Sequence, residues 1–252
     1  MFNTVVLAGS PNTGPLKDCS RARSEALIKI GSRYMVEYVV ETLLQSSMTG
    51  NIVVVGPQKE LGRLFKHPRI IVAEGGNTVV ESLQVGLRRI QADNPVLIAT
   101  SDIPLLSVEA VEDFLNLCRG RQADVHYPIV AQEIIEETYP EVERTYVSLQ
   151  EGVFTGGNLF LVNPAVVDKC AGFAQEIVDL RKSPFRLCQL LGLKFIFKFL
   201  LKKLSLPEIE EKVSDILDIT AVAVISRYPE IGVDVDKPSD LAVVSAFLGK
   251  TA

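Results

Sequence analysis

The chain has no tryptophan, only two histidines and only four cysteines, and these scarcities exclude several kinds of site. The cysteines are widely spaced and form no CxxC pair, so we expect no zinc site. Reduced thiols, as in a cytoplasmic protein, are the expected state. The net charge of -5 shows no global excess of basic residues, which argues against nucleic acid as a partner.

Long apolar runs are also missing. No stretch approaches the length needed to cross a bilayer, and no cationic region precedes the short apolar run near the N-terminus. We therefore expect a cytoplasmic protein whose first apolar segment is a strand. With 252 residues, of which 47% are hydrophobic, the chain is long and apolar enough for one large domain spanning 1–252.

Apolar periodicity predicts alternating strands and helices in the first half. We expect strands at 5–7, 52–55, 70–73 and 95–100, and helices at 35–45, within 75–90 and at 108–117. This alternation is typical of parallel strands joined by crossover helices. It predicts an α/β fold of the Rossmann-like, three-layer α/β/α kind with a mostly parallel, mixed sheet.

The second half is less regular. Strands are expected at 127–130, 144–149, 159–162 and 221–226, with an acidic segment between the first two, and a helix closes the chain. Residues from about 165 to 217 are expected to be mainly helical, interrupted at Pro184 and Pro207. We interpret this region as a helical elaboration of the same domain.

The loop after the first strand has the composition of a phosphate-binding loop. The strand ends at Ala8 and Gly9, and glycine, small polar and basic residues follow, among them Lys17 and Arg23. Backbone N–H groups and cations in such a loop suit a phosphate chain. It is not a P-loop, because Pro15 stands where the lysine should be, and no GxGxxG follows the strand.

Two groups of acidic residues are expected at the same edge of the sheet. Asp102 directly follows the strand at 95–100, while Asp234 and Asp236 follow the late strand. Open α/β sheets place ligands at the carboxyl ends of their strands. Mg²⁺ takes hard oxygen ligands and often uses one or two carboxylates together with substrate phosphates. We expect Asp102 and Asp236, or alternatively Asp234, to bind Mg²⁺; a turn or cap is the competing interpretation.

Four blocks in order give a family resemblance: VVLAGS, SEALIKIGSRYMVEYVVETL, ATSDIPLLSVEAV and VDVDKPSDLAVV. Together they resemble the NTP-transferase superfamily typified by molybdenum-cofactor guanylyl- and cytidylyltransferases. The segment GGNTVVESLQVGL adds similarity to methylerythritol-phosphate cytidylyltransferases. The resemblance implies an Mg²⁺-dependent nucleotidyltransferase that moves NMP from an NTP to a phosphorylated small-molecule acceptor and releases diphosphate.

The resemblance also implies roles at matching positions. Nucleoside binding falls on Leu7, Ala8, Gly9, Gly76 and Ser82, acceptor binding on Gly157 and Asn158, and catalytic or metal-binding roles on Asp102 and Asp236. For Gly156 and Gly157, a turn leading into a strand is an equally weighted alternative.

One departure from the family pattern bears on catalysis. The family's loop usually carries a Pro-Lys pair, and here Ser24 and Glu25 take its place. The hypothesis is that Lys17 or Arg23 supplies the missing positive charge. The alternatives are a nucleotide-binding protein without turnover, and a nucleotide-sugar glycosyltransferase on a related fold. Asp234 and Asp236 look like a glycosyltransferase DxD motif, but that motif normally lies mid-domain and here it lies near the C-terminus.

The segment 191–206, LGLKFIFKFLLKKLSL, combines aromatic residues with lysines. From Arg181 to Lys203 there are seven basic residues and no acidic one. One interpretation is a helix that packs in the core or in a homodimer interface, with its lysines at the solvent edge. The other is peripheral contact with an anionic membrane, which would place the acceptor among lipid-linked phosphates.

Overall fold

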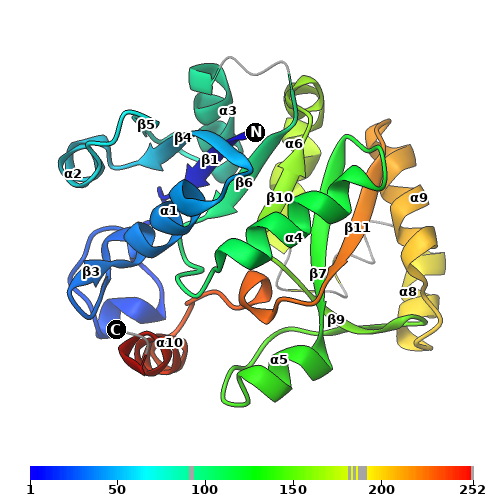
Figure 1. The fold of residues 1–252 in the computed structure, drawn as a ribbon. Helices are drawn as coiled ribbons and strands as arrows, with labels where there is room; N and C mark the ends of the chain where they lie inside the picture. The colour runs from blue at the N-terminus through cyan, green and yellow to red at the C-terminus, as the bar shows by residue number, and fades with distance from the viewer. Residues whose placement is uncertain (91–93, 181–182, 184–185, 187–191, 251–252) are drawn as a thin grey trace.

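The computed structural model describes residues 1–90, 94–180, 183, 186 and 192–250. Its centre is a nine-stranded sheet of order β5-β4-β1-β6-β10-β7-β9-β8, with β11 paired to β7 (Figure 1). The strands are β1 (Phe2–Leu7), β4 (Thr49–Gly56), β5 (Ile70–Glu74), β6 (Val96–Thr100), β7 (Val125–Ala131), β8 (Val147–Leu149), β9 (Gly152–Gly156), β10 (Leu159–Val162) and β11 (Ala221–Ser226).

The sheet is parallel in its first half and mixed in its second. β1 lies between β4 and β6 and pairs with both in parallel, and β5 extends this half as a further parallel strand. β10 runs antiparallel to β6 and β7, and β9 runs antiparallel to β7 and β8. β1, β4 and β6 are nearly continuous apolar runs because both of their faces are covered.

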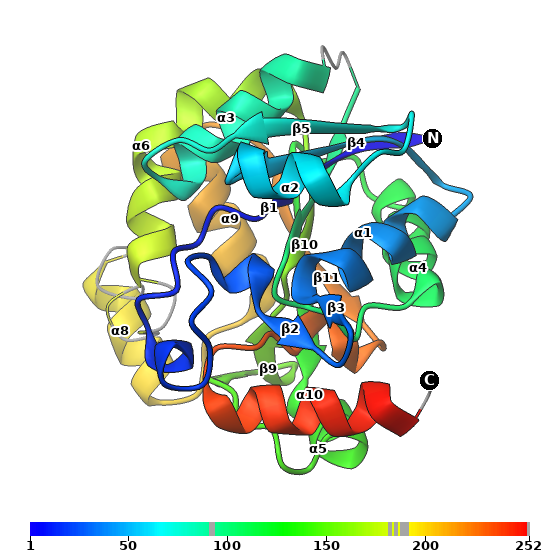
Figure 2. The ribbon, with the colours of Figure 1, turned by 90° about the vertical axis from the view of Figure 1, so that its left-hand side faces the viewer.

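Helices cover both faces and produce two cores (Figures 1 and 2). Val6 belongs to the core that also contains residues of α1 and α4, whereas its neighbour Val5 belongs to a second core with α3. This split follows from the two-residue period of a strand. The helices are α1 (Met35–Gln45), α2 (Gln58–Leu64), α3 (Val79–Ile90), α4 (Val108–Arg119), α5 (Gln132–Thr138), α6 (Pro164–Leu180), α8 (Leu193–Leu200), α9 (Leu206–Leu217) and α10 (Pro238–Lys250).

The expected α/β architecture is confirmed, with local corrections. The strand expected at 144–149 is shorter, at Val147–Leu149, and the acidic segment before it contains α5. β9, α2 and the small β2–β3 hairpin (Lys29–Ile30 and Arg33–Tyr34) were not expected. Pro207 lies in the first turn of α9, where proline is tolerated, so it starts a helix rather than breaking one. Pro184 lies outside the described residues.

Three cysteines, Cys19, Cys118 and Cys170, are free thiols, as expected, and Cys188 lies outside the described residues. Burial raises the pKa of the Cys118 thiol to about 12, so this thiol stays protonated at neutral pH. Among the helices that the structure describes, none has the length and apolar character to cross a membrane.

Close packing of α3 on the sheet gives a stability test. A Cβ on Gly86 would lie 2.6 Å from Val5 Cγ1 and 3.1 Å from Val55 Cγ2. We expect Gly86→Ala to lower the free energy of unfolding by about 1–3 kcal/mol through overpacking. The matched control is Gly62→Ala in α2, where a Cβ meets nothing within 4 Å. Alanine there should stabilise by up to about 1 kcal/mol. Urea unfolding of both variants measures this, and equal effects would contradict the packing argument.

Candidate functional site

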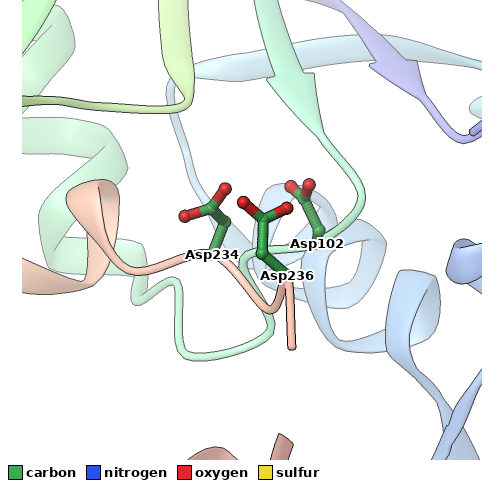
Figure 3. Close-up of side chains that lie close together, drawn as sticks. All are labelled: Asp102, Asp234 and Asp236. Carbon is green, nitrogen blue, oxygen red and sulfur yellow. The ribbon is translucent and has the colours of Figure 1, made fainter. Parts of the chain in front are cut away.

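Three aspartates from distant parts of the sequence meet at one edge of the sheet. Asp102 follows β6, and Asp234 and Asp236 follow the short helix η3 (Pro229–Gly232). One carboxylate oxygen from each lies within 4.8 Å of the others. Figure 3 shows the three carboxyl groups pointing the same way from the two loops. The structure thus brings together all three acids that the sequence proposed as metal ligands.

Val235, between the two aspartates, fixes this arrangement. Its backbone N–H donates to the carbonyl oxygen of Asp102 at 2.8 Å. Its side chain is fully buried in an apolar cluster with Leu16 of the N-terminal loop and Val244 of α10. Because neighbouring side chains of an extended segment point to opposite sides, burying Val235 directs Asp234 and Asp236 away from the cluster.

Arg144 is a buried cation within the acidic site. Its Nη2 forms an ion pair with Asp234 Oδ1, and its Nη1 donates to the Asp234 carbonyl oxygen at 3.2 Å. The two side chains are only 11% and 6% exposed. Burial lowers the pKa of Arg144, and the carboxylates of Asp236 and Asp102 oppose that shift, so the guanidinium stays charged. Asp234 therefore already has a cationic partner.

Sequence reasoning missed Arg144 although a signal was present. It is the only lysine or arginine between Arg121 and Lys169, and acidic residues precede it. A lone cation in an acidic stretch points to a specific partner. The partner itself is not readable, because it lies 90 positions further along the chain.

A second missed residue, Asp240, holds the end of the acidic segment. Its side chain is 1% exposed, and its Oδ2 accepts hydrogen bonds from the backbone N–H groups of Asp236 at 3.1 Å and Lys237 at 3.2 Å. An acid three residues into a helix commonly bonds back to the residue before that helix, and this spacing was the available signal. Asp240 therefore fixes the backbone of Asp236.

The N-terminal loop is closed at its base by polar contacts. Asn12 Nδ2 donates to the carbonyl oxygens of Ser20 and Ala22, both at 3.0 Å, and Ser24 Oγ donates to the Ala8 carbonyl oxygen at 3.1 Å. The loop contains the short helix η1 (Pro15–Asp18). Lys17, within η1, and Arg23, further along the loop, are both exposed. The loop is thus an ordered platform that presents these two cations to solvent.

Glu25, in place of the usual lysine, interacts with this loop. Its carboxylate accepts a hydrogen bond from Ser10 Oγ at 2.8 Å, and its backbone N–H donates to the Ser10 carbonyl oxygen at 3.1 Å. A Cβ on Gly14 would lie 3.8 Å from Glu25 Oε1. An acidic group therefore lies beside the part of the loop expected to bind phosphate.

The residues expected to bind the nucleoside gather at the ends of β1, β4 and β5. Ser82 Oγ accepts a hydrogen bond from the Gly76 N–H at 3.1 Å, and a Cβ on Gly9 would lie 3.8 Å from that oxygen. The Leu7 carbonyl and both backbone polar groups of Ala8 already bond within the protein. Gly9, by contrast, is exposed. At this corner it presents accessible backbone.

The expected acceptor residues lie between β9 and β10. Asn158 N–H donates to the Ile231 carbonyl oxygen at 2.9 Å, and the Thr100 N–H donates to the Asn158 carbonyl oxygen at 3.1 Å. A Cβ on Gly157 would lie 2.6 Å from Ile231 Cγ2. Both residues are buried; Asn158 joins β6 to η3, and the Gly157 N–H donates to the Pro128 carbonyl oxygen of β7 at 2.9 Å. These contacts give them a structural role, while acceptor binding stays a prediction.

The buried pair gives a second stability test. We expect Arg144→Met to cost about 3–5 kcal/mol in the free energy of unfolding, because it leaves the Asp234 carboxylate buried without its cation. The control is Arg227→Met, which removes an arginine that is 74% exposed and pairs with Asp113. That change should cost about 1 kcal/mol or less. Chemical denaturation compares the two variants, and similar losses would contradict the role assigned to Arg144.

Comparison with known proteins places the chain in a family. A family model described as a MobA-like NTP transferase domain matches residues 5–179. A solved structure described as a hypothetical transferase from Thermus thermophilus is 36% identical, with a TM-score of 0.81, and the match covers 95% of this chain and 99% of that one. A comparison with curated proteins finds no match.

Two cytidylyl-type enzymes share the fold at low identity. A CMP:2-keto-3-deoxy-manno-octonic acid synthetase complexed with CTP is 13% identical, with a TM-score of 0.64 and complete coverage of both chains. The 2-C-methyl-D-erythritol 4-phosphate cytidylyltransferase of Francisella tularensis is 12% identical, with a TM-score of 0.61 and coverage of 98% and 99%.

The family match spans more than half of the chain, which therefore belongs to the MobA-like NTP transferase domain family and is a nucleotidyltransferase.

Proposed function

We propose that this nucleotidyltransferase moves NMP from an NTP to a phosphorylated small-molecule acceptor, releases diphosphate and depends on Mg²⁺. The observation that carries the proposal is the meeting of Asp102, Asp234 and Asp236 within 4.8 Å beside the loop that holds Lys17 and Arg23. The two cytidylyl-type neighbours support it, since one binds CTP and the other is named for a phosphorylated acceptor. A cytoplasmic location without nucleic acid as partner belongs to the same proposal.

The donor set fits magnesium. Three carboxylates offer hard oxygen atoms, and one or two of them suffice when substrate phosphates complete the coordination. Asp102, at the end of β6, and Asp236, whose backbone Asp240 fixes, would hold the ion, and Asp234, which pairs with Arg144, would lie beside them. When bound, Mg²⁺ neutralises charge around the α-phosphate and orients the triphosphate.

The chain's own residues would position both substrates. The exposed backbone of Gly9 and the Gly76–Ser82 contact form the corner for the nucleoside, and the loop leading away from it carries Lys17 and Arg23 towards the phosphates. An acceptor phosphate oxygen attacks the α-phosphorus in line with the bond that breaks, and diphosphate leaves. Placement and charge compensation provide the catalysis, as in other phosphoryl-type transfers.

The overall reaction is tested by measuring diphosphate release. Each of the four NTPs is combined with a panel of phosphorylated metabolites in the presence of Mg²⁺, and then with Mg²⁺ replaced by EDTA. We expect release with one NTP and a limited group of acceptors. If nucleotide binds but no combination releases diphosphate, the result would favour a nucleotide-binding protein without turnover. Glu25, at the position of the usual lysine, is the residue that suggests this alternative.

The metal ligands are tested by comparing three isosteric substitutions. We expect Asp102→Asn and Asp236→Asn each to lower kcat on the order of a hundredfold, because a metal ligand contributes several kcal/mol to transition-state stabilisation. Asp234→Asn should lower kcat less, since its carboxylate pairs with Arg144. Electron paramagnetic resonance measures the binding of Mn²⁺ to the three variants in the absence of substrates. We expect Asp102→Asn and Asp236→Asn to weaken Mn²⁺ binding more than Asp234→Asn does. An Asp234→Asn variant that loses the metal while Asp236→Asn keeps it would reverse the assignment.

The loop cations are tested by charge reversal. Lys17→Glu or Arg23→Glu should raise the KM for NTP or lower kcat by about tenfold or more if the loop binds the phosphates. Lys59→Glu, at an exposed position of α2 outside the loop, is the matched control. If both loop variants behave like this control, the loop is not the phosphate site. Increased activity of Glu25→Lys would instead indicate a site that has lost part of its charge compensation.

A further inference from the structure

Three large apolar side chains stand out from the surface at α8. Phe197 is 66%, Leu200 61% and Leu201 64% exposed. Apart from Met1, every other large apolar residue in the described part of the chain is at most 50% exposed. Phe197 and Leu200 lie three positions apart, on one face of the helix, and Leu201 follows directly. Such an exposed cluster is typical of an interaction surface.

The fold does not need these three side chains. The opposite side of α8 carries Phe195 and Phe199, which are partly buried, and Lys198 forms an ion pair with Glu208 of α9. The chain just after α8 is fixed to the β8–β9 turn, where the Gln150 N–H donates to the Leu204 carbonyl oxygen at 2.9 Å. These contacts involve the inner side of α8 and leave the exposure of its outer side unexplained.

The segment that carries the exposed cluster is basic in sequence. Residues 192–204 contain four lysines and no acidic residue, in a chain whose net charge is -5. α8 ends at Leu200, and Lys202, two residues later, has a φ of 54° that turns the chain. Both Lys202 and Lys203 are exposed next to Leu201 in the sequence. In both views α8 lies at the outer edge of the molecule, where a flat surface can reach it (Figures 1 and 2).

We propose that this α8 face, defined as Phe197, Leu200, Leu201, Lys202 and Lys203, binds the surface of an anionic membrane. The apolar side chains would enter the boundary of the acyl chains, and the lysines would lie at the headgroups. A second copy of the chain fits less well, because a twofold interface places the same patch, and therefore the same lysines, against each other. The proposal is independent of nucleotidyl transfer.

Co-sedimentation of the full chain with vesicles tests the proposal. We expect binding to vesicles of phosphatidylcholine with phosphatidylglycerol at low salt, much weaker binding at high salt, and none to phosphatidylcholine alone. The triple variant Phe197→Ser, Leu200→Ser, Leu201→Ser should bind at least tenfold more weakly. The double variant Lys202→Glu, Lys203→Glu should lose binding to a similar extent. Since all five side chains are exposed, these variants should keep the wild-type unfolding midpoint, which is measured alongside.

The matched control removes three exposed apolar residues from other surfaces: Ile71→Ser, Leu117→Ser and Ile225→Ser. This variant should bind anionic vesicles as the wild type does. Absence of wild-type binding at low salt would overturn the proposal, as would a triple α8 variant that still binds fully. A dimer in sedimentation equilibrium that the triple α8 variant abolishes, without vesicle binding, would show instead that a second copy occupies this face.

Discussion

The geometry of the site depends on the burial of one small apolar side chain, Val235. Its contacts with Leu16 and Val244 pull the acidic segment against the N-terminal loop. Its backbone N–H bonds to Asp102, which the sheet fixes at the end of β6. The alternation of side chains along an extended segment then places Asp234 and Asp236 on the side opposite to Val235, and there their carboxylates lie within 4.8 Å of that of Asp102. The burial of Val235 thus positions the N-terminal loop, the three aspartates and the edge of the sheet relative to one another, although its side chain is none of the groups proposed to touch substrate.

Bringing several carboxylates together is unfavourable, and the fold compensates for it in two ways. Arg144 places a buried positive charge against Asp234, and the backbone N–H groups of Asp236 and Lys237 bond to Asp240. A buried ion pair contributes little net stability by itself, but removing one partner leaves a costly buried charge. The arrangement therefore stabilises the carboxylates of Asp234 and Asp240 within the protein. Asp102 and Asp236 are the pair that we propose as ligands of a divalent cation.

The sequence predicts those parts of the molecule whose signal is local. β1, β4 and β6 are covered on both faces and contain long apolar runs, so their positions can be read from the sequence. The predicted ends of β1 and β6 locate Gly9 and Asp102 at the edge of the sheet, where the structure has them. The partner of Arg144 could not be predicted, because the ion pair spans 90 positions and leaves no periodic pattern. β9 escaped prediction because glycine stands at both of its ends, and Gly152 has a φ of +146°. The pairing of Asp234 with Arg144, which distinguishes it from Asp236 in the proposed metal site, likewise has no local signal in the sequence.

The two halves of the sheet carry different parts of the proposed function. The parallel half, β5-β4-β1-β6, holds Gly9, Ser82 and the phosphate-type loop. The antiparallel extension is linked to the segments that carry the proposed metal ligands through Asn158, which bonds to both Thr100 and Ile231. The same extension anchors the chain after α8 through Gln150 in the β8–β9 turn. A membrane bound at α8 would therefore contact the antiparallel half of the molecule, which also contains Gly157 and Asn158, the residues expected to bind the acceptor. The parallel half, which carries the nucleotide corner, contributes no residue to that surface.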